Sequence, residues 1–230
     1  MKDFEKFSKE LGIKFKNINL LITALTHRSY LNEHQNVEEH NERLEFLGDA
    51  ILELVVTEYL YRNFKNPEGD LTNWRSALVK TETISEVSKD LDAEDYILMS
   101  KGESRSLGRS RQLILANAFE AIIGAIFLDQ GIETAKEFIE KNLIIKLDKI
   151  LQEKLYVDPK SLFQELVQDK DGVTPTYEVL EEVGPDHDKT FTIGVFVGDK
   201  VWGKGVGPSK QAAQQSAAID AVEKYQKNNN

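Results

Sequence analysis

The stretch "HNERLEFLGDAILELVV", residues 40–56, decides how this chain folds. From its fifth residue onward, apolar residues recur at the spacing of a buried helix. Glu42, Glu45 and Asp49 interrupt that pattern at intervals of three and four residues, so one helix would carry all three carboxylates on one side. Such a row is usually a solvated helix face. Here Gly48 lies beside Asp49 and would let a second helix approach closely, which favours a packed, functional arrangement.

A second apolar segment carries polar residues at a matching interval. It reads "QLILANAFEAIIGAIFLDQG", residues 112–131, with an asparagine and a glutamate three residues apart. If the two helices pack with these faces together, four oxygen-bearing side chains gather in one pocket: Glu45, Asp49, Asn117 and Glu120. Clustered carboxylates need a cation to neutralise them, and a ligand set made only of oxygen atoms suits Mg²⁺ or Mn²⁺. Such an ion can orient a water for attack on phosphorus. Di-iron bundles instead need Glu-x-x-His pairs, and no histidine of this sequence has a glutamate three residues before it.

Composition limits the chemistry open to the chain. Of its 230 residues, 40% are hydrophobic and 30% are charged, and none is cysteine, so disulfides and thiolate metal sites are excluded. No apolar run is long enough for a membrane span, and the charged N-terminus lacks the apolar core of a secretory signal. We therefore expect a cytoplasmic protein without a membrane partner. The net charge of −10 argues against a nucleic-acid partner unless the cations gather locally.

The pattern of the chain changes near residues 155–158. Residues 1–153 read as almost wholly helical, and the part after "NPEGD" is predicted as a helix capped by Thr72. Residues 158–227 read as a short helix, three alternating strands and an alanine-rich helix, with a tight turn at Gly198. The expected fold is thus an all-α N-terminal domain followed by a small α+β domain of α-β-β-β-α order.

The decisive stretch is also recognisable. "NERLEFLGDA", residues 41–50, resembles the signature of bacterial ribonuclease III. Three further segments are similar to the same family: "LTHRSY", "EGDLTNWRSALV" and "FEAIIGAIFLDQG". The segments "TPTYEVLEEVGPDHDKTFTIGVFVGDK" and "GPSKQAAQQSAA" resemble the family's double-stranded-RNA-binding domain. The resemblance implies an all-α endonuclease domain at 1–153 and a double-stranded-RNA-binding domain at 158–227.

The resemblance also implies an activity and a site. It implies a Mg²⁺-dependent hydrolase, in which Mn²⁺ can substitute, that acts as a homodimer without a small-molecule cofactor. Such an endonuclease would cut both strands of double-stranded RNA, leave 5′-phosphate and 3′-hydroxyl ends with two-nucleotide 3′ overhangs, and process ribosomal and messenger RNA precursors. On the matching positions the metal ligands are Glu45, Asp49, Asn117 and Glu120, of which Asp49 and Glu120 are also the catalytic residues. Glu42 and Glu68 match secondary acidic positions.

Asn117 departs from the family pattern, which has aspartate at this position. An amide oxygen can ligate Mg²⁺, but it brings no negative charge, so we expect weaker metal affinity or slower cleavage. Three interpretations remain open: a natural variant that still cuts, an engineered substitution, and a natural loss of catalysis. The alternative function is therefore a catalytically impaired or inactive double-stranded-RNA-binding protein on the same scaffold.

The second domain supplies the RNA contacts that the resemblance implies. They are Gln164 on its first helix, His187 in the loop between its first two strands, and Ser209, Lys210 and Gln214 at the start of its last helix. The family has a lysine cluster where this chain has Pro208 and Gln211. We therefore predict weaker, more Mg²⁺-dependent RNA binding with a shallow salt dependence.

Two simpler interpretations, which require no catalytic or RNA-binding role, stand beside these hypotheses. His27 and Ser29 in "THRS" are interpreted as residues that pin helix packing, and not as part of a hydrolase triad. The chain as a whole could also be a protein-interaction module unrelated to RNA, which would bind no duplex RNA even at low salt.

Overall fold

The computed structural model describes residues 2–185 and 189–227. The chain divides into two compact units, Met1–Tyr156 and Val157–Asn230.

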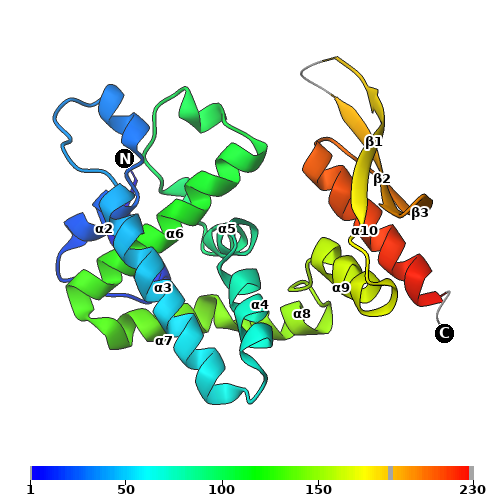
Figure 1. The fold of residues 1–230 in the computed structure, drawn as a ribbon. Helices are drawn as coiled ribbons and strands as arrows, with labels where there is room; N and C mark the ends of the chain where they lie inside the picture. Colours follow the sequence, from blue (N-terminus) through cyan, green and yellow to red (C-terminus); the bar gives the residue numbers. More distant parts are fainter. Residues whose placement is uncertain (1, 186–188, 228–230) are drawn as a thin grey trace. The chain divides into compact units, whose positions relative to one another are not determined.

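The first unit is built from helices (Figure 1). Its α-helices are α1 (Phe4–Glu10), α2 (Ile18–Ala24), α3 (Glu42–Asn63), α4 (Glu68–Val79), α5 (Thr81–Asp90), α6 (Gly108–Gln130), α7 (Ile132–Asn142) and α8 (Leu147–Gln152). Short 3₁₀ helices lie between them: η1 (Arg28–Asn32), η2 (Ala93–Asp95), η3 (Glu103–Arg105) and η4 (Ile144–Lys146). Helix α3 packs along α6, and α2, α5 and α7 also pack on α6. The predicted helical first domain is confirmed.

Helix α6 forms the centre of this unit's core. By length and composition alone it could cross a membrane, but 61% of its most apolar window is buried inside the unit. Leu115, Phe119 and Ile122 are fully buried on it. A helix that is apolar on nearly every side is the core helix of a globular unit when its neighbours cover it in this way.

Two glycines let α3 and α6 approach each other. A Cβ atom on Gly48 would overlap the backbone carbonyl of Glu120, and one on Gly124 would overlap that of Leu44. Backbone therefore lies against backbone at this crossing, and the turns on either side of it are held in a fixed register. The close approach predicted from Gly48 is confirmed.

The segment after Pro67 differs from the prediction. Helix α4 begins at Glu68, so Thr72 lies inside the helix and the predicted cap at Thr72 is wrong. Pro67 precedes the first helical residue with a φ of −55°, where its missing N–H removes no helical hydrogen bond. Helix α4 ends where Lys80 adopts an extended conformation, and α5 follows at once.

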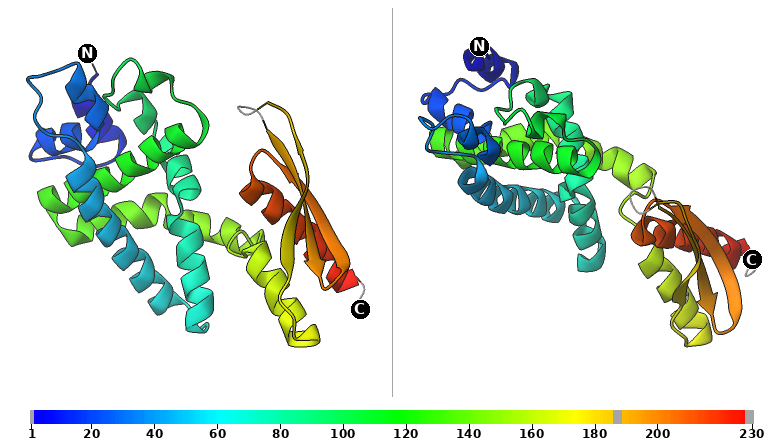
Figure 2. Two further views of the ribbon diagram at one scale, coloured as in Figure 1. Left: turned by 45° about the horizontal axis from the view of Figure 1, so that its top comes forward. Right: turned by 90° about the horizontal axis from the view of Figure 1, so that it is seen from above.

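The second unit packs two helices on one antiparallel sheet (Figures 1 and 2). Its elements are α9 (Pro159–Asp171), β1 (Thr176–Val183), β2 (Thr190–Val197), β3 (Lys200–Gly207) and α10 (Lys210–Lys227), with strand order β1-β2-β3. Phe163 of α9, Ile193 of β2 and Ala217 of α10 share one core. The predicted α-β-β-β-α order is confirmed.

Glycine and alanine also set the packing of the second unit. Gly203, Gly205 and Gly207 alternate along β3, and a Cβ atom on any of them would meet α10 at Ala213, Ala217 or their neighbours. The alanine-rich face of α10 therefore rests directly on the backbone of β3. This contact fixes the start of α10, where the predicted RNA contacts lie.

Candidate functional site

The crossing of α3 and α6 brings the four predicted metal ligands together. Glu45 and Asp49 lie one turn apart on α3, on either side of the close contact at Gly48. Asn117 and Glu120 lie one turn apart on α6. The Asn117 amide lies near Glu45 and lowers the pKa of that carboxyl group, and the carboxylates of Asp49 and Glu45 raise the pKa of Glu120.

Glu120 is the most strongly perturbed carboxyl group of this cluster. Burial, followed by the charges of Asp49 and Glu45, raises the pKa of Glu120 to about 8. Desolvation penalises the charged form, and two neighbouring anions penalise it further. In the metal-free chain this side chain therefore carries a proton at neutral pH.

Glu45 has an unpaired oxygen in the same cluster. Burial and the nearby Glu42 raise the pKa of Glu45, while the nearby Asn117 amide opposes that rise. Its Oε2 atom is buried and has no hydrogen-bond partner among the described residues. A buried oxygen without a partner is costly, and a cation ligated by that oxygen would remove the cost.

The carboxylates are near one another without enclosing a common point. Among residues 2–185 and 189–227, no three His, Cys, Asp or Glu side chains converge closely enough to hold a metal ion. The metal site stays a prediction.

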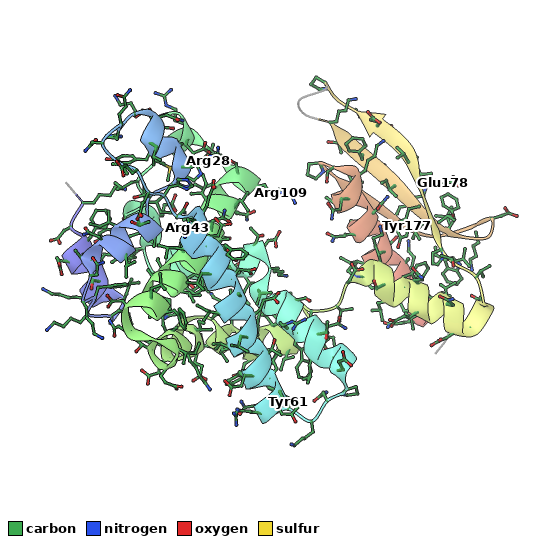
Figure 3. All side chains as sticks on the ribbon, turned by 60° about the vertical axis from the view of Figure 1, so that its left-hand side comes forward. Arg28, Arg43, Tyr61, Arg109, Tyr177 and Glu178 are labelled. Carbon is green, nitrogen blue, oxygen red and sulfur yellow. The ribbon has the colours of Figure 1, made fainter. Side chains whose placement is uncertain are left out.

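Glu42 lies at the edge of the cluster. Its Oε1 atom pairs with Arg28 at 3.3 Å, and its Oε2 atom lies 4.0 Å from the Nδ1 atom of His40. Figure 3 shows Arg28 and Arg43 near this end of α3 and Tyr61 near the other end. Glu42 contributes charge to the cluster through its effect on Glu45.

Glu68 lies away from the other acids. It opens α4 and lines a groove with Tyr61, Phe64 and Arg75 at the C-terminal end of α3. Helix α3 has 22 residues, a length of about 30 Å at ~1.5 Å per residue. Glu45 belongs to its first turn, so the two glutamates of one chain do not share a site.

His27 and Ser29 hold a loop in place. The His27 Nδ1 atom lies 2.8 Å from the Ser29 hydroxyl, and that hydroxyl accepts the backbone N–H of Ser100 at 3.1 Å. Burial lowers the pKa of His27, so the neutral ring is favoured. The contacts join the segment before α3 to the segment before α6 and agree with a packing role.

The second unit places two of the predicted RNA contacts, Gln164 and Gln214, at or beside one groove. Gln164 of α9 lines a groove that Gln211 of α10 also lines. Ser209 accepts the backbone N–H of Ala212 at 3.2 Å, so its hydroxyl caps the first turn of α10. Gln214 accepts a hydrogen bond from Lys160. His187, the predicted loop contact, lies outside the described residues.

Lys160 and Tyr177 also line this groove, and the sequence did not predict them as part of an RNA-binding surface. Lys160 is the second residue of α9, and Tyr177 lies on β1 (Figure 3). Neither belongs to a charged cluster in the sequence. Their proximity depends on how α9, β1 and α10 pack, which no local pattern encodes.

Comparison with known proteins gives the same division of the chain. A family model described as "Ribonuclease-III-like" matches residues 17–147, and a "Double-stranded RNA binding motif" matches residues 159–225. "Ribonuclease 3" of Protochlamydia amoebophila is 45% identical over 218 residues, which cover 94% of this chain and 90% of that protein. "Ribonuclease 3" of Treponema denticola is 42% identical over 219 residues, or 95% and 89% of the two chains.

A solved structure resembles the first unit. The nuclease domain of ribonuclease III from Campylobacter jejuni has a TM-score of 0.55 and 46% identity, and the match covers 62% of this chain and 99% of that one. That structure shows flexibility in the region involved in dimer formation of the Campylobacter nuclease domain. The helical unit, its acidic crossing and the RNA-binding unit thus have one explanation, which is that this chain belongs to the ribonuclease III family and is an endoribonuclease with a double-stranded-RNA-binding domain.

Proposed function

We propose that this endoribonuclease is Mg²⁺-dependent and cuts double-stranded RNA into products with 5′-phosphate and 3′-hydroxyl ends and two-nucleotide 3′ overhangs. The observation that carries the proposal is the crossing of α3 and α6, which brings Asp49 and Glu45 close enough to raise the pKa of the buried carboxyl group of Glu120 and places Asn117 beside Glu45. Ribosomal and messenger RNA precursors in the cytoplasm are the proposed substrates, on the basis of family membership.

The side chains of the cluster suit a hard divalent cation. Only oxygen donors are present, and the buried Oε2 atom of Glu45 has no partner within the described chain. The residues that would hold the ion are Glu45, Asp49, Asn117 and Glu120. When bound, Mg²⁺ or Mn²⁺ supplies positive charge against the phosphate and orients the attacking water.

The chain's own residues position this chemistry. The Asn117 amide favours the charged form of Glu45. Glu120 binds a proton at neutral pH in the metal-free protein, so ligation requires that proton to leave. We propose Asp49 and Glu120 as the catalytic residues, and the backbone contact at Gly48 holds both in register.

We propose that the protein acts as a homodimer through α3. Three large apolar side chains on this helix are exposed, at 81% for Phe46, 61% for Leu54 and 75% for Tyr61. They are eight and seven residues apart, close to two helical turns each, and therefore lie along one side of α3. A two-fold, antiparallel contact between copies of α3 would bring Glu68 of each chain toward the other chain's acidic cluster.

Cleavage of a long duplex RNA tests the proposed function. The protein, its Glu120→Gln variant and its Asn117→Asp variant are compared in Mg²⁺ and in Mn²⁺, and the ends of the products are sequenced. We expect the unchanged chain to cut with two-nucleotide overhangs, Glu120→Gln to lose at least about a hundredfold in rate, and Asn117→Asp to cut at least as fast as the parent. Binding of the duplex without cleavage by the parent in either metal would contradict the proposal.

A further inference from the structure

A polar groove in the second unit lies between its two helices and its first strand. Its described lining comes from α9 and its cap, from α10, and from the start of β1 with the residue before it: Asp158, Lys160, Ser161, Gln164, Pro175, Tyr177, Gln211 and Gln215. Gln164 was assigned to RNA contact from the sequence, and Gln211 follows Lys210 in the assigned segment of α10. The groove therefore belongs to the face on which RNA is expected.

Lys160 is fixed in this groove by two contacts. Its Nζ atom donates a hydrogen bond to the Oε1 atom of Gln214 at 2.7 Å and lies 4.9 Å from the centre of the Tyr177 ring. The side chain reaches from α9 to α10 and is half-buried. An ammonium group has three donors, so the contact with Gln214 leaves two for a ligand.

Among the described residues that line the groove, Lys160 is the one cationic side chain. The carboxylate of Asp158 also lines the groove. It already accepts hydrogen bonds from the Ser161 backbone N–H at 3.1 Å and from the Ser161 hydroxyl at 2.7 Å. Burial raises the pKa of Tyr177 to about 12, so the phenol stays neutral. The glutamine side chains add amide donors without charge.

Helix α10 is short of positive charge in its first turns. Lys210 opens the helix, with its Nζ atom 5.7 Å from the centre of the Phe191 ring, whereas positions 211 and 214 are glutamine. An RNA-binding face needs cations at phosphate spacing to release counterions on binding. Lys160 places an ammonium group directly beside Gln214, although it belongs to another helix.

We propose that Lys160 is an RNA-backbone contact, which binds a phosphate at the groove and supplies from α9 the positive charge that Gln211 and Gln214 do not supply from α10. This inference rests on the double-stranded-RNA binding proposed above. Gln214 acts on the same contact by holding the ammonium group on the face shared by both helices.

The salt dependence of RNA binding tests this proposal. The full chain with Glu120→Gln, which prevents cleavage, is titrated with a short duplex RNA at several KCl concentrations and constant Mg²⁺, and gels confirm that the RNA stays intact. We expect Lys160→Gln to weaken binding about tenfold, the loss of one charge-assisted hydrogen bond. The slope of log K against log salt should become shallower by up to about one.

Three further variants separate charge from structure. Lys224→Gln removes the same charge from the other end of α10, where Lys224 pairs with Asp220 at 2.6 Å, and should change neither affinity nor slope. Lys160→Arg and the double variant Lys160→Gln/Gln214→Lys should both restore most of the slope. Melting temperatures confirm that each variant is folded.

The outcomes distinguish this inference from the function on which it rests. If the parent chain binds duplex RNA and Lys160→Gln behaves like Lys224→Gln, the inference is overturned while the proposed function stands. A loss of affinity with an unchanged slope would assign Lys160 a purely structural role and would also overturn it. If the parent binds no duplex RNA, both fail together.

Discussion

Asn117 changes the balance of charge in the acidic cluster of α3 and α6. Its amide favours the charged form of Glu45, whereas a carboxylate at this position would repel it. The metal-free site is therefore less strained than a cluster of four acids would be. The same neutral side chain lowers the negative charge available to a cation.

Asn117→Asp should separate these two effects. We expect it to lower the stability of the metal-free protein by about 1 kcal/mol or more, because an amide that favours the charged Glu45 is replaced by a carboxylate that repels it. Stabilisation by Mg²⁺ should become larger, since a fourth carboxylate attracts the ion. Melting temperatures in EDTA and in a series of Mg²⁺ concentrations measure both. Equal stabilisation of parent and variant by Mg²⁺ would show that the residue at this position does not affect ligation.

The pKa of Glu120 predicts how stability depends on pH. Its folded-state pKa of about 8 lies above the ordinary value of 4.5, so the folded chain retains a proton that the unfolded chain loses. The stability contributed by this group is complete below pH 4.5 and falls as pH rises toward 8. In EDTA, the parent should therefore lose more stability between pH 5 and pH 8 than Glu120→Gln, which has no proton to lose. Parallel pH profiles for the two proteins would contradict this prediction.

At the scale of helices, the crossing at Gly48 carries both the core and the site. A side chain there cannot rotate out of the way, because the atoms that it would meet belong to the backbone of α6. We predict that Gly48→Ala destabilises the protein by about 3 kcal/mol, the upper range for overpacking. Denaturation by urea measures the loss.

Gly69 supplies the matched control. It lies in the first turn of α4, and a Cβ atom there would have no neighbour within 4 Å. Gly69→Ala should leave stability unchanged or raise it slightly, because alanine favours a helix. Similar losses for both variants would mean that the two helices can separate at the crossing without much cost.

The sequence predicted the helices that carry the site better than it predicted their ends. The interval between Glu45 and Asp49, and the glycine between them, was sufficient to predict a second helix against this one. The start of α4 was misplaced because Thr72 is a good capping residue in isolation, whereas Pro67 decides where the helix begins. The contact of Lys160 with Gln214 joins residues 54 positions apart, and no periodicity records such a pair.

At the scale of the whole molecule, the exposed apolar residues of α3 predict association. Leu54→Glu should convert the protein to a monomer, because a carboxylate in the contact would be desolvated without a partner. Its melting temperature under dissociating dilution should match that of the parent, since Leu54 is 61% exposed within one chain. Sedimentation at several concentrations measures the molecular mass. Lys149→Glu, on the exposed side of α8, is the control and should leave the mass unchanged.

The backbone contact between α3 and α6 determines which amino-acid substitutions this enzyme tolerates. A screen of random variants for lost activity will find positions without a functional side chain, such as Gly124, as often as the acidic residues. The reason is that the helices that form the core also position the predicted ligands. A protein can therefore keep the site only if it also keeps the close crossing of these two helices. Grafting four acidic or amide side chains onto another pair of helices would reproduce the residue types of the site without the spacing that makes them act together.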